Sequence, residues 1–314
     1  MCAMRFVSVE IPPDCEGLTV DYVLRTCLGA SDRAIRRAKR VDGAVLLDGV
    51  PARCKAKVSA GQRLSLLVED VALGCAATSI NPQPGPLDIL YQDEGLLIVN
   101  KQAGIVVHPS PGHDQDTLAN YVAFHLKEQG ISACIHPVSR LDSKTTGAVV
   151  FALNGHVHNR LEGLMHTQGF QREYLALCEG HFRPGQQRGT IDAPWARLTR
   201  HPNTFGVQAD GKKAVTHYQV IDQRVLDGRP VSAVRLELET GRTHQIRIHM
   251  QYAGHPLIGD VTYGAPDKRI SRHALHSWRV ELTHPVTQRQ LSIEAALPSD
   301  MLELAHLSDL RIAR

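Results

Sequence analysis

Apolar and polar positions in the first seventy residues follow the periods of short helices and strands. Two stretches repeat apolar residues every three to four positions, and two others are short apolar runs. They predict helices over residues 18–28 and 32–40 and strands over residues 44–47 and 63–68. Gly29 ends the first helix, Ser31 is a good N-cap for the second, and Asp48-Gly49 suits a hairpin turn. The pattern therefore predicts a small α/β unit at the start of the chain.

A proline-rich stretch separates this unit from the rest of the chain. Residues 81–86 read Asn-Pro-Gln-Pro-Gly-Pro, and three prolines in five residues cannot continue a helix or a central strand. We therefore predict an extended linker over residues 71–86. A chain of 314 residues is long enough for two domains, which we expect at residues 1–70 and 87–314.

From residue 87 onward, short strand-like runs alternate with stretches of helical period. Strands are expected over residues 87–91, 96–100, 148–153, 171–180 and 236–239, and from residue 213. Helices are expected over residues 117–129 and 156–166. A third helix is expected after Gly241, with Thr243 as its cap. The larger domain should therefore contain both strands and helices.

The composition indicates an ordinary globular protein, with 43% hydrophobic and 21% charged residues. No apolar run approaches the roughly 18 residues of a membrane span, and the first ten residues contain no apolar stretch of signal-peptide length. The seven cysteines are odd in number and include no C-x-x-C pair, so they predict neither a disulfide framework nor a zinc site. Free thiols in a cytoplasmic protein explain them most simply, and no contact with a membrane is expected.

Basic residues are concentrated in the small unit, although the net charge of the whole chain is only +3. Between residues 31 and 63, nine Lys or Arg residues stand against three Asp residues. Four arginines share one face of the second predicted helix, namely Arg33, Arg36, Arg37 and Arg40. Such a cluster can be a solvated surface. Its recurrence on a helix, a hairpin and the following segment instead favours contact with RNA phosphates.

One short segment offers a candidate for chemistry. Arg140 stands two residues before Asp142, in a stretch punctuated by Pro137 and Gly147. The apolar run over residues 148–153 follows at once and has the length of one buried strand. Asp142 would then lie in a loop next to a rigid strand, which can fix the orientation of its side chain. The alternative is a structural ion pair between Arg140 and Asp142, followed by an ordinary turn.

A second candidate segment joins a predicted strand to a predicted helix. Residues 236–250 alternate apolar and polar residues up to Gly241 and continue with Arg242, His244 and Arg247. On the helix, His244 and Arg247 share one face. A metal site formed by His244 and His249 is a poor alternative, because a spacing of five residues places them on different faces.

Several segments together resemble the pseudouridine synthases, the large family that modifies ribosomal large-subunit RNA and some tRNA. Residues 140–147 match a catalytic motif that reads roughly R-L-D-x-x-T-S/T-G, although Ser139 stands where the family usually has histidine. The other matching segments are residues 100–109 (with Gln102 in place of proline), 172–180, 241–249, 255–264 and 272–276. The resemblance covers residue 87 to about residue 300. It implies an α+β fold, a mixed and mainly antiparallel sheet with flanking helices and a central cleft.

The resemblance also implies roles for three residues in catalysis. Asp142 would be the essential residue, and Arg247 would pair with it and keep its carboxylate ionised. Tyr174 would pack against the uracil ring and is a candidate base, since a phenol offers a flat face and a proton-transferring oxygen. On its position alone, Tyr174 could equally be a half-buried strand residue.

Four further residues are expected at the RNA by the same resemblance. Arg140 is the candidate wedge or phosphate contact, and Leu275 is the expected hydrophobic wall of the base pocket, which is compatible with a place in the core. Arg242 and His244 belong to the matched 241–249 segment and are expected to contact RNA.

The small unit has a resemblance of its own. Residues 17–70 resemble an RNA-binding module first described in a ribosomal small-subunit protein, with a basic helix, an Asp-Gly turn and the late V-x-x-G-x-x-L segment at residues 58–64. This resemblance implies that the unit supplies RNA affinity.

These observations predict an RNA uridine-to-pseudouridine isomerase that acts on large-subunit (23S) ribosomal RNA. The sequence contains no glycine-rich phosphate loop, nicotinamide fingerprint or convincing metal set, so no cofactor or metal is expected. The carboxylate could attack the sugar or take a sugar proton, and both routes stay open. Alternatives are a tRNA pseudouridine synthase of the same family, a non-catalytic RNA-binding ribosome-assembly factor and a two-carboxylate glycosidase. We expect a monomer.

Overall fold

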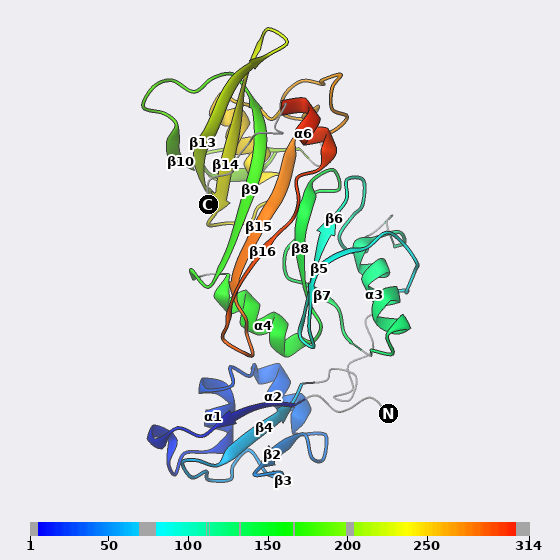
Figure 1. Cartoon of the computed structure of the whole chain (residues 1–314). Helices are drawn as coiled ribbons and strands as arrows, with labels where there is room; N and C mark the ends of the chain where they lie inside the picture. The colour runs from blue at the N-terminus through cyan, green and yellow to red at the C-terminus, as the bar shows by residue number, and fades with distance from the viewer. Residues whose placement is uncertain are drawn as a thin grey trace.

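The structure is a computed structural model of the chain, and it describes residues 6–68, 80–110, 112, 114–131, 133–165, 167–198 and 204–305. The part of the predicted linker that precedes residue 80 lies outside these ranges. Within them, no helix is both long enough and apolar enough to pass through a membrane. The described residues form a small four-stranded sheet and a large ten-stranded sheet (Figure 1).

The small sheet and its two helices occupy the start of the chain. The strands are β1 (Phe6–Glu10), β2 (Val45–Leu47), β3 (Val50–Pro51) and β4 (Arg63–Leu67), and the helices are α1 (Val20–Thr26) and α2 (Asp32–Ala38). The strand order is β1-β4-β2-β3, and all pairs are antiparallel. The predicted helices and strands are thus confirmed, with α2 ending before Arg40, whereas β1 and β3 were not predicted.

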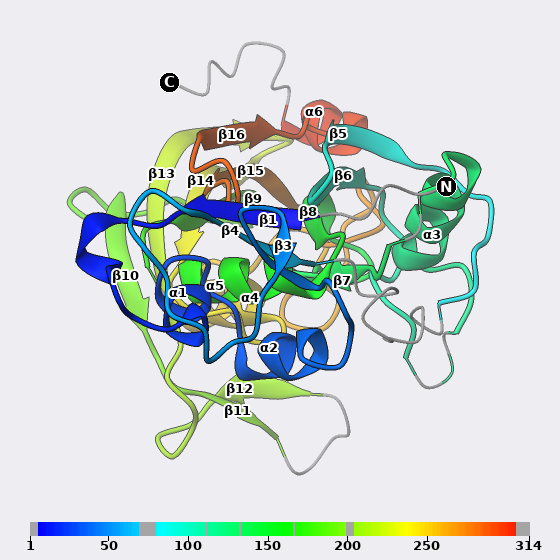
Figure 2. The same cartoon turned by 90° about the horizontal axis from the view of Figure 1, so that it is seen from below.

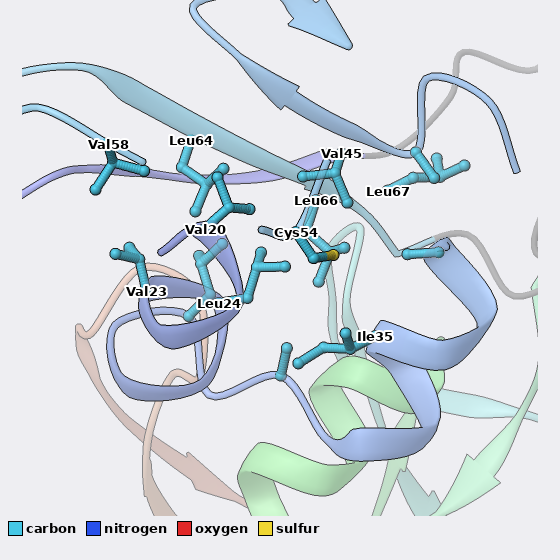
Figure 3. Packing of buried hydrophobic residues seen from close by; sticks show 14 of the residues in the cluster. Val20, Val23, Leu24, Ile35, Val45, Cys54, Val58, Leu64, Leu66 and Leu67 are labelled. Atoms are coloured by element: carbon cyan, nitrogen blue, oxygen red, sulfur yellow. The ribbon is translucent and has the colours of Figure 1, made fainter. Parts of the chain in front are cut away.

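Local chemistry explains where the two helices begin. Thr19 caps α1 by accepting a hydrogen bond from the backbone N–H of Tyr22, and Ser31 caps α2 in the same way with Ala34. The helices bury Val23, Leu24 and Ile35 against strand residues such as Leu64 and Leu66 (Figure 3). The cluster of buried residues they form draws only on residues 11–68.

The large sheet begins at residue 88. Its strands are β5 (Asp88–Gln92), β6 (Leu96–Lys101), β7 (His136–Pro137), β8 (Thr146–Ala152), β9 (Phe170–Glu179), β10 (Arg188–Asp192), β13 (Val215–Leu226), β14 (Arg229–Leu238), β15 (Leu275–Thr283) and β16 (Gln290–Glu294). Eight of them follow the order β10-β13-β14-β9-β15-β8-β6-β5, with β7 beside β8 and β16 beside β15. The β8–β15 pair is parallel and the other pairs are antiparallel. The expected mixed, mainly antiparallel sheet is confirmed.

Helices cover both faces of this sheet. They are α3 (Leu118–Glu128), α4 (Gly155–Leu164), α5 (Gln245–Tyr252) and α6 (Ser299–Ala305). Strand β8 is buried along its whole length, and its side chains alternate between two cores. Val149 and Phe151 pack with α3, whereas Val150 packs with Val157 and Leu161 of α4. Figure 2 shows α6 on one side of the sheet and α4 on the other.

Gly147 allows β8 to approach β15. Its φ is +109°, and a Cβ atom at this position would lie 2.2 Å from the carbonyl oxygen of Ser277. Only glycine fits such a contact without a backbone shift. The loop that carries Asp142 therefore joins the centre of the sheet directly, which fixes its position.

The predicted cap of the third helix was wrong. Helix α5 begins at Gln245, and the residue before it, His244, has a left-handed backbone with φ +57° and makes no side-chain cap. Thr243 instead accepts a hydrogen bond on its carbonyl oxygen from the indole N–H of Trp195. Trp195 belongs to a small hairpin of β11 (Trp195–Arg197) and β12 (Phe205–Val207), which projects at the lower edge of Figure 2.

Candidate active site

The Asp142 loop runs from β7 to β8 and is held at both ends. The N–H of Thr145 donates to the carbonyl of Asp142 at 3.0 Å, which closes a tight turn. Ser139 is 3% exposed, and its hydroxyl accepts a hydrogen bond from the N–H of Val150 in β8. The serine that replaces the family's usual histidine therefore connects the loop to strand β8.

Lys101 fixes the other side of this loop. It is 1% exposed, and its ammonium donates to the carbonyl oxygens of Ser143, Ile105 and Gln102 at 2.7, 2.9 and 2.9 Å. Burial lowers the pKa of Lys101 to about 7, although the charge of Asp142 acts in the opposite direction. The three carbonyl acceptors also favour the charged form. The family-like segment at residues 100–109 contained this lysine, but its contacts could not be read from the sequence.

Arg247 meets two carboxylates. Its Nη1 donates to Oδ2 of Asp142 at 3.1 Å, so the predicted pair is present. Its Nε and Nη2 donate to both oxygens of Asp260 at 2.7 and 2.8 Å, and this bidentate partner was not predicted. Burial would lower the pKa of Arg247, but hydrogen bonds and charge from Asp260 and Asp142 outweigh it and raise that pKa.

Asp260 is fixed by its own turn. It is 1% exposed, and its Oδ1 also accepts from the N–H groups of Thr262 and Tyr263. Burial favours its neutral form, but the hydrogen bonds and charge of Arg247 lower its pKa overall. The preceding Gly259 has φ +73°, and a Cβ atom there would lie 2.3 Å from the carbonyl oxygen of Arg272. The signal in the sequence was the Gly-Asp pair of the 255–264 segment.

Two threonines of the Asp142 loop bind buried histidines. Thr145 Oγ lies 2.7 Å from Nε2 of His273, and Thr146 Oγ lies 2.8 Å from Nδ1 of His276. Nε2 of His276 faces the carbonyl of Ala295, which can only accept, so this nitrogen carries the proton. Burial lowers the pKa of each histidine to about 4. Both are therefore neutral and structural. His273 lies in the segment before β15 and His276 lies within it, since that strand begins at Leu275.

A cleft of about 650 Å³ opens above these residues. The predicted site residues that line it are Arg140, Asp142, Tyr174, Arg242, His244, Arg247 and Leu275. They come from four separate segments, and the fold brings all seven together. Tyr174 and Leu275 are each 4% exposed and stand on the neighbouring strands β9 and β15. Arg140 and Arg242 are exposed at the rim.

The four predicted arginines of the small unit lie elsewhere, on α2 and the residues after it. Arg33, Arg36 and Arg40 are exposed, and Arg37 is half-buried. His249 also lies away from the cleft, where it is buried against Thr216 and the carbonyl of Ala193. In the ranges that the structure describes, no group of three or more His, Cys, Asp or Glu side chains is arranged to hold a metal ion.

Comparisons with known proteins agree with this geometry. The family model described as RNA pseudouridylate synthase matches residues 95–252, half of the chain. An uncharacterised RNA pseudouridine synthase of Bacillus subtilis (YhcT) is 42% identical over 228 residues, which cover 73% of this chain and 74% of that protein. Ribosomal large subunit pseudouridine synthase D of Pseudomonas aeruginosa is 33% identical over 314 residues, covering 96% of this chain and 95% of that protein.

A solved structure of a pseudouridylate synthase has a similar fold. Human RNA pseudouridylate synthase domain containing 1 matches with a TM-score of 0.56 and 26% identity, over 68% of this chain and 86% of that one. The range matched by the family model includes Asp142, Tyr174 and Arg247, the residues that meet in the cleft. The chain belongs to the RNA pseudouridylate synthase family and is an isomerase that acts on uridine in RNA.

Proposed function

We propose that the chain converts specific uridines of large-subunit (23S) ribosomal RNA to pseudouridine and that Asp142 starts the reaction. The observation that supports the role of Asp142 is its 3.1 Å hydrogen bond from Arg247. This pair lies in a cleft that is also lined by Tyr174 and Leu275, the residues expected to contact the uracil base. The ribosomal target is supported by the P. aeruginosa relative, which is named for the large subunit and is covered over 95% of its length.

The chemistry needs no redox partner. The N1–C1′ bond of uridine breaks and a C5–C1′ bond forms, so that C5 loses a proton and N1 gains one. Asp142 begins the exchange by attacking the anomeric carbon or by taking a proton from the sugar. Arg247 orients the carboxylate by donating a hydrogen bond to its Oδ2.

The rest of the cleft binds the base and the RNA. Tyr174 stacks on the uracil ring and is the candidate base for the C5 proton, and Leu275 closes the pocket beside it. A uridine within structured RNA must first be flipped out of its stack. Arg140, exposed at the rim, acts as the wedge or as a phosphate contact, and Arg242 and His244 contact the RNA beside it.

The proposed organisation is an RNA-binding module over residues 1–70, a linker over 71–86 and a catalytic domain over 87–314. The separate core of residues 11–68 and the exposed arginines of α2 support it. We take the module to be related to the ribosomal small-subunit one, and the protein to be a monomer. Its place of action would be the cytoplasm, where buried thiols such as that of Cys178 stay reduced.

One alternative is disfavoured by a specific contact. A two-carboxylate glycosidase needs a second acid that can exchange protons at the reacting bond. The second carboxylate near Asp142 is that of Asp260, and Arg247 binds both of its oxygens. An acid held in this way stays ionised and is not available as a proton donor.

The test compares pseudouridine maps of total RNA from cells with and without the gene. Loss of specific pseudouridines from 23S RNA, restored by the wild-type gene and not by Asp142→Asn, is the expected result. In vitro, Asp142→Asn should abolish tritium release from RNA labelled at uridine C5 while RNA affinity stays within about severalfold. Loss of pseudouridines from tRNA alone would show that the target is tRNA and not ribosomal RNA. Turnover by Asp142→Asn would refute the proposal that Asp142 starts the reaction.

A further inference from the structure

His244 occupies an unusual place in the cleft. Its backbone is left-handed, with φ +57°, which a residue other than glycine adopts at a cost of about 1–3 kcal/mol. Its Nε2 faces Oδ2 of Asp142 at 3.8 Å, and its Nδ1 lies 2.9 Å from the hydroxyl of Tyr263. The backbone therefore places one ring nitrogen toward the reactive carboxylate and the other toward a phenol.

Aromatic neighbours hold the ring in this orientation. Phe205 contacts it edge-on, with centroids 5.7 Å apart, and Tyr263 does so from another side at 5.6 Å. Phe205 is itself stacked on Trp195, whose indole N–H binds the carbonyl of Thr243 at 2.8 Å. The β11–β12 hairpin thus secures both the His244 ring and the backbone just before it.

The two partners of the His244 ring indicate which of its nitrogens carries the proton. Nε2 faces Oδ2 of Asp142, and a carboxylate oxygen can only accept a hydrogen bond. Nδ1 is then the acceptor of a hydrogen bond from the hydroxyl of Tyr263. A neutral His244 then has its proton on Nε2, the nitrogen that faces Asp142.

The charge state of His244 follows from its surroundings. The ionisable groups around it are Asp142, Arg247, Asp260 and Tyr263. Burial lowers the pKa of His244 and outweighs the opposing charge of Asp142. The neutral form is therefore the one present at neutral pH.

We infer that His244 is a positioning residue for Asp142: a neutral imidazole, locked with its proton on Nε2 by Tyr263, that directs an N–H at Oδ2. Arg247 binds the same oxygen at 3.1 Å, and Oδ1 receives no hydrogen bond from the residues that the structure describes. Arg247 thus binds Oδ2 and the imidazole N–H is directed at it, which leaves Oδ1 as the oxygen that reacts. Catalytic hydrogen bonds are often long without substrate and shorten when it binds, so the 3.8 Å contact is expected to become a hydrogen bond in the complex. This inference rests on the proposed role of Asp142.

A first experiment reads the tautomer without any activity assay. The full chain labelled with 15N-histidine is studied by NMR at neutral pH, and the His244→Gln spectrum assigns the His244 signals. The expected result is the neutral form with the proton on Nε2. Tyr263→Phe, which removes only the hydroxyl, should convert it to a mixture of tautomers. A proton on Nδ1, a cationic ring, or no change in Tyr263→Phe would overturn the inference.

A second experiment compares two replacements for His244 in single-turnover assays at saturating RNA. Gln can place an amide N–H near the position of Nε2, whereas Asn reaches only the position of Nδ1. Asn adopts left-handed backbone more readily, so backbone strain cannot explain a poorer result for it. His244→Asn should lower turnover roughly 10- to 100-fold, the effect of one lost hydrogen bond to a charged group. His244→Gln should retain most of the turnover.

The outcomes separate this inference from the proposed function. Equal loss of turnover in both variants would overturn the inference. Weaker RNA binding with an unchanged rate at saturating RNA would also overturn it and would make His244 an RNA contact only. A wild-type enzyme without activity on any RNA would overturn the proposed function instead. In that case the NMR result still decides the tautomer and its dependence on Tyr263.

Discussion

The carboxylate of Asp260 holds the guanidinium of Arg247 through two hydrogen bonds, of 2.7 and 2.8 Å. Only Nη1 remains for Asp142, at 3.1 Å. The side chain of Asp260 is 1% exposed and that of Asp142 is 25% exposed. The buried carboxylate thus fixes the orientation of the arginine, and the more accessible carboxylate is the one to which we assign the proposed catalytic role.

This arrangement predicts that Asp260 acts on turnover through Arg247. Arg247→Met should lower turnover by orders of magnitude, because Asp142 loses the cationic hydrogen-bond donor that orients its carboxylate. Asp260→Asn should lower it roughly 100-fold, since a misplacement of about 1 Å has that effect. The double variant should be no slower than Arg247→Met alone, because the two residues act as one unit. Single-turnover rates at saturating RNA measure all three.

A control for lost ion pairing is Asp267→Asn, which removes the bidentate partner of Arg269 away from the cleft. It should leave turnover within about twofold of wild type, the size of a minor surface effect. Asp260→Asn should also lose about 3 kcal/mol of unfolding free energy, because the buried guanidinium loses its bidentate partner and keeps only the single bond to Asp142. Equal turnover in Asp260→Asn and the control would contradict the proposed aiming of Arg247.

The buried histidines predict how stability depends on pH. The folded pKa of His276 is about 4, against 6.5 for a free histidine. Between these values the unfolded chain binds a proton that the folded chain does not, so the unfolding free energy falls as pH drops from 6.5 to 4. The loss is at most about 3 kcal/mol for this residue and levels off below pH 4. Urea unfolding at several pH values measures it.

His276→Asn should be less stable at pH 7, because Thr146 and Ala295 lose their partner, but its stability should fall less steeply between pH 6.5 and 4. The difference in slope between the two proteins isolates this one group from the carboxylates. His181→Asn, on an exposed histidine, is the matched control and should keep the wild-type slope. An unchanged slope in His276→Asn would mean that His276 takes up its proton over the same pH range in the folded and unfolded chains, which would contradict the prediction.

Much of the cleft could be predicted because its residues lie in short contiguous segments. Asp142 and Gly147 share one short segment, and His244 and Arg247 share another. Asp260 was missed because its pairing with Arg247 crosses 13 residues and depends on the turn at Gly259, which has no periodic signal. A pattern of apolar positions reports which face is buried, and it does not report which polar groups meet.

The wrong helix cap has a similar cause. Thr243 is a good cap by local propensity, but the hairpin of Trp195 holds its carbonyl and His244 turns the chain through a left-handed backbone. Tertiary contacts therefore overrode a local preference. The ring contacts of Phe205 and Tyr263 with His244 join residues far apart in the chain, so no local pattern could indicate them.

Contacts between α4 and the small unit predict a defined docking of the proposed module. Nη1 of Arg160 donates to the carbonyl of Leu28 at 2.8 Å, and Asn159 donates to the hydroxyl of Ser31, the cap of α2, at 3.1 Å. Arg160→Ala should free the module while both cores stay folded. Small-angle scattering should then show a larger radius of gyration, and affinity for natural RNA should fall severalfold.

Lys127→Ala, on the exposed side of α3, removes a positive charge without touching this contact and is the matched control. It should leave the radius of gyration unchanged. Turnover of Arg160→Ala at saturating RNA should also stay at the wild-type level, because the cleft residues lie on other elements. An unchanged radius in Arg160→Ala would show that this contact does not hold the module in place.

The basic module should supply RNA affinity and not chemistry. Its core uses residues 11–68, and the residues that line the cleft all follow residue 105. A chain without residues 1–80 should therefore fold, keep the Arg247–Asp142 pair and turn over short RNA at the full-length rate.

The truncated chain should need a higher concentration of the natural RNA, and each lost phosphate contact should lower the slope of log affinity against log salt by about one unit. In the full chain, Arg33→Gln with Arg36→Gln should reproduce part of that change, since both side chains are exposed on α2. Glu128→Gln, at the exposed end of α3, raises the net charge and is the control that should leave the slope nearly unchanged. A truncated chain that unfolds would make the first helices part of the catalytic core. One that binds natural RNA as tightly as the full chain would show that the module has another role.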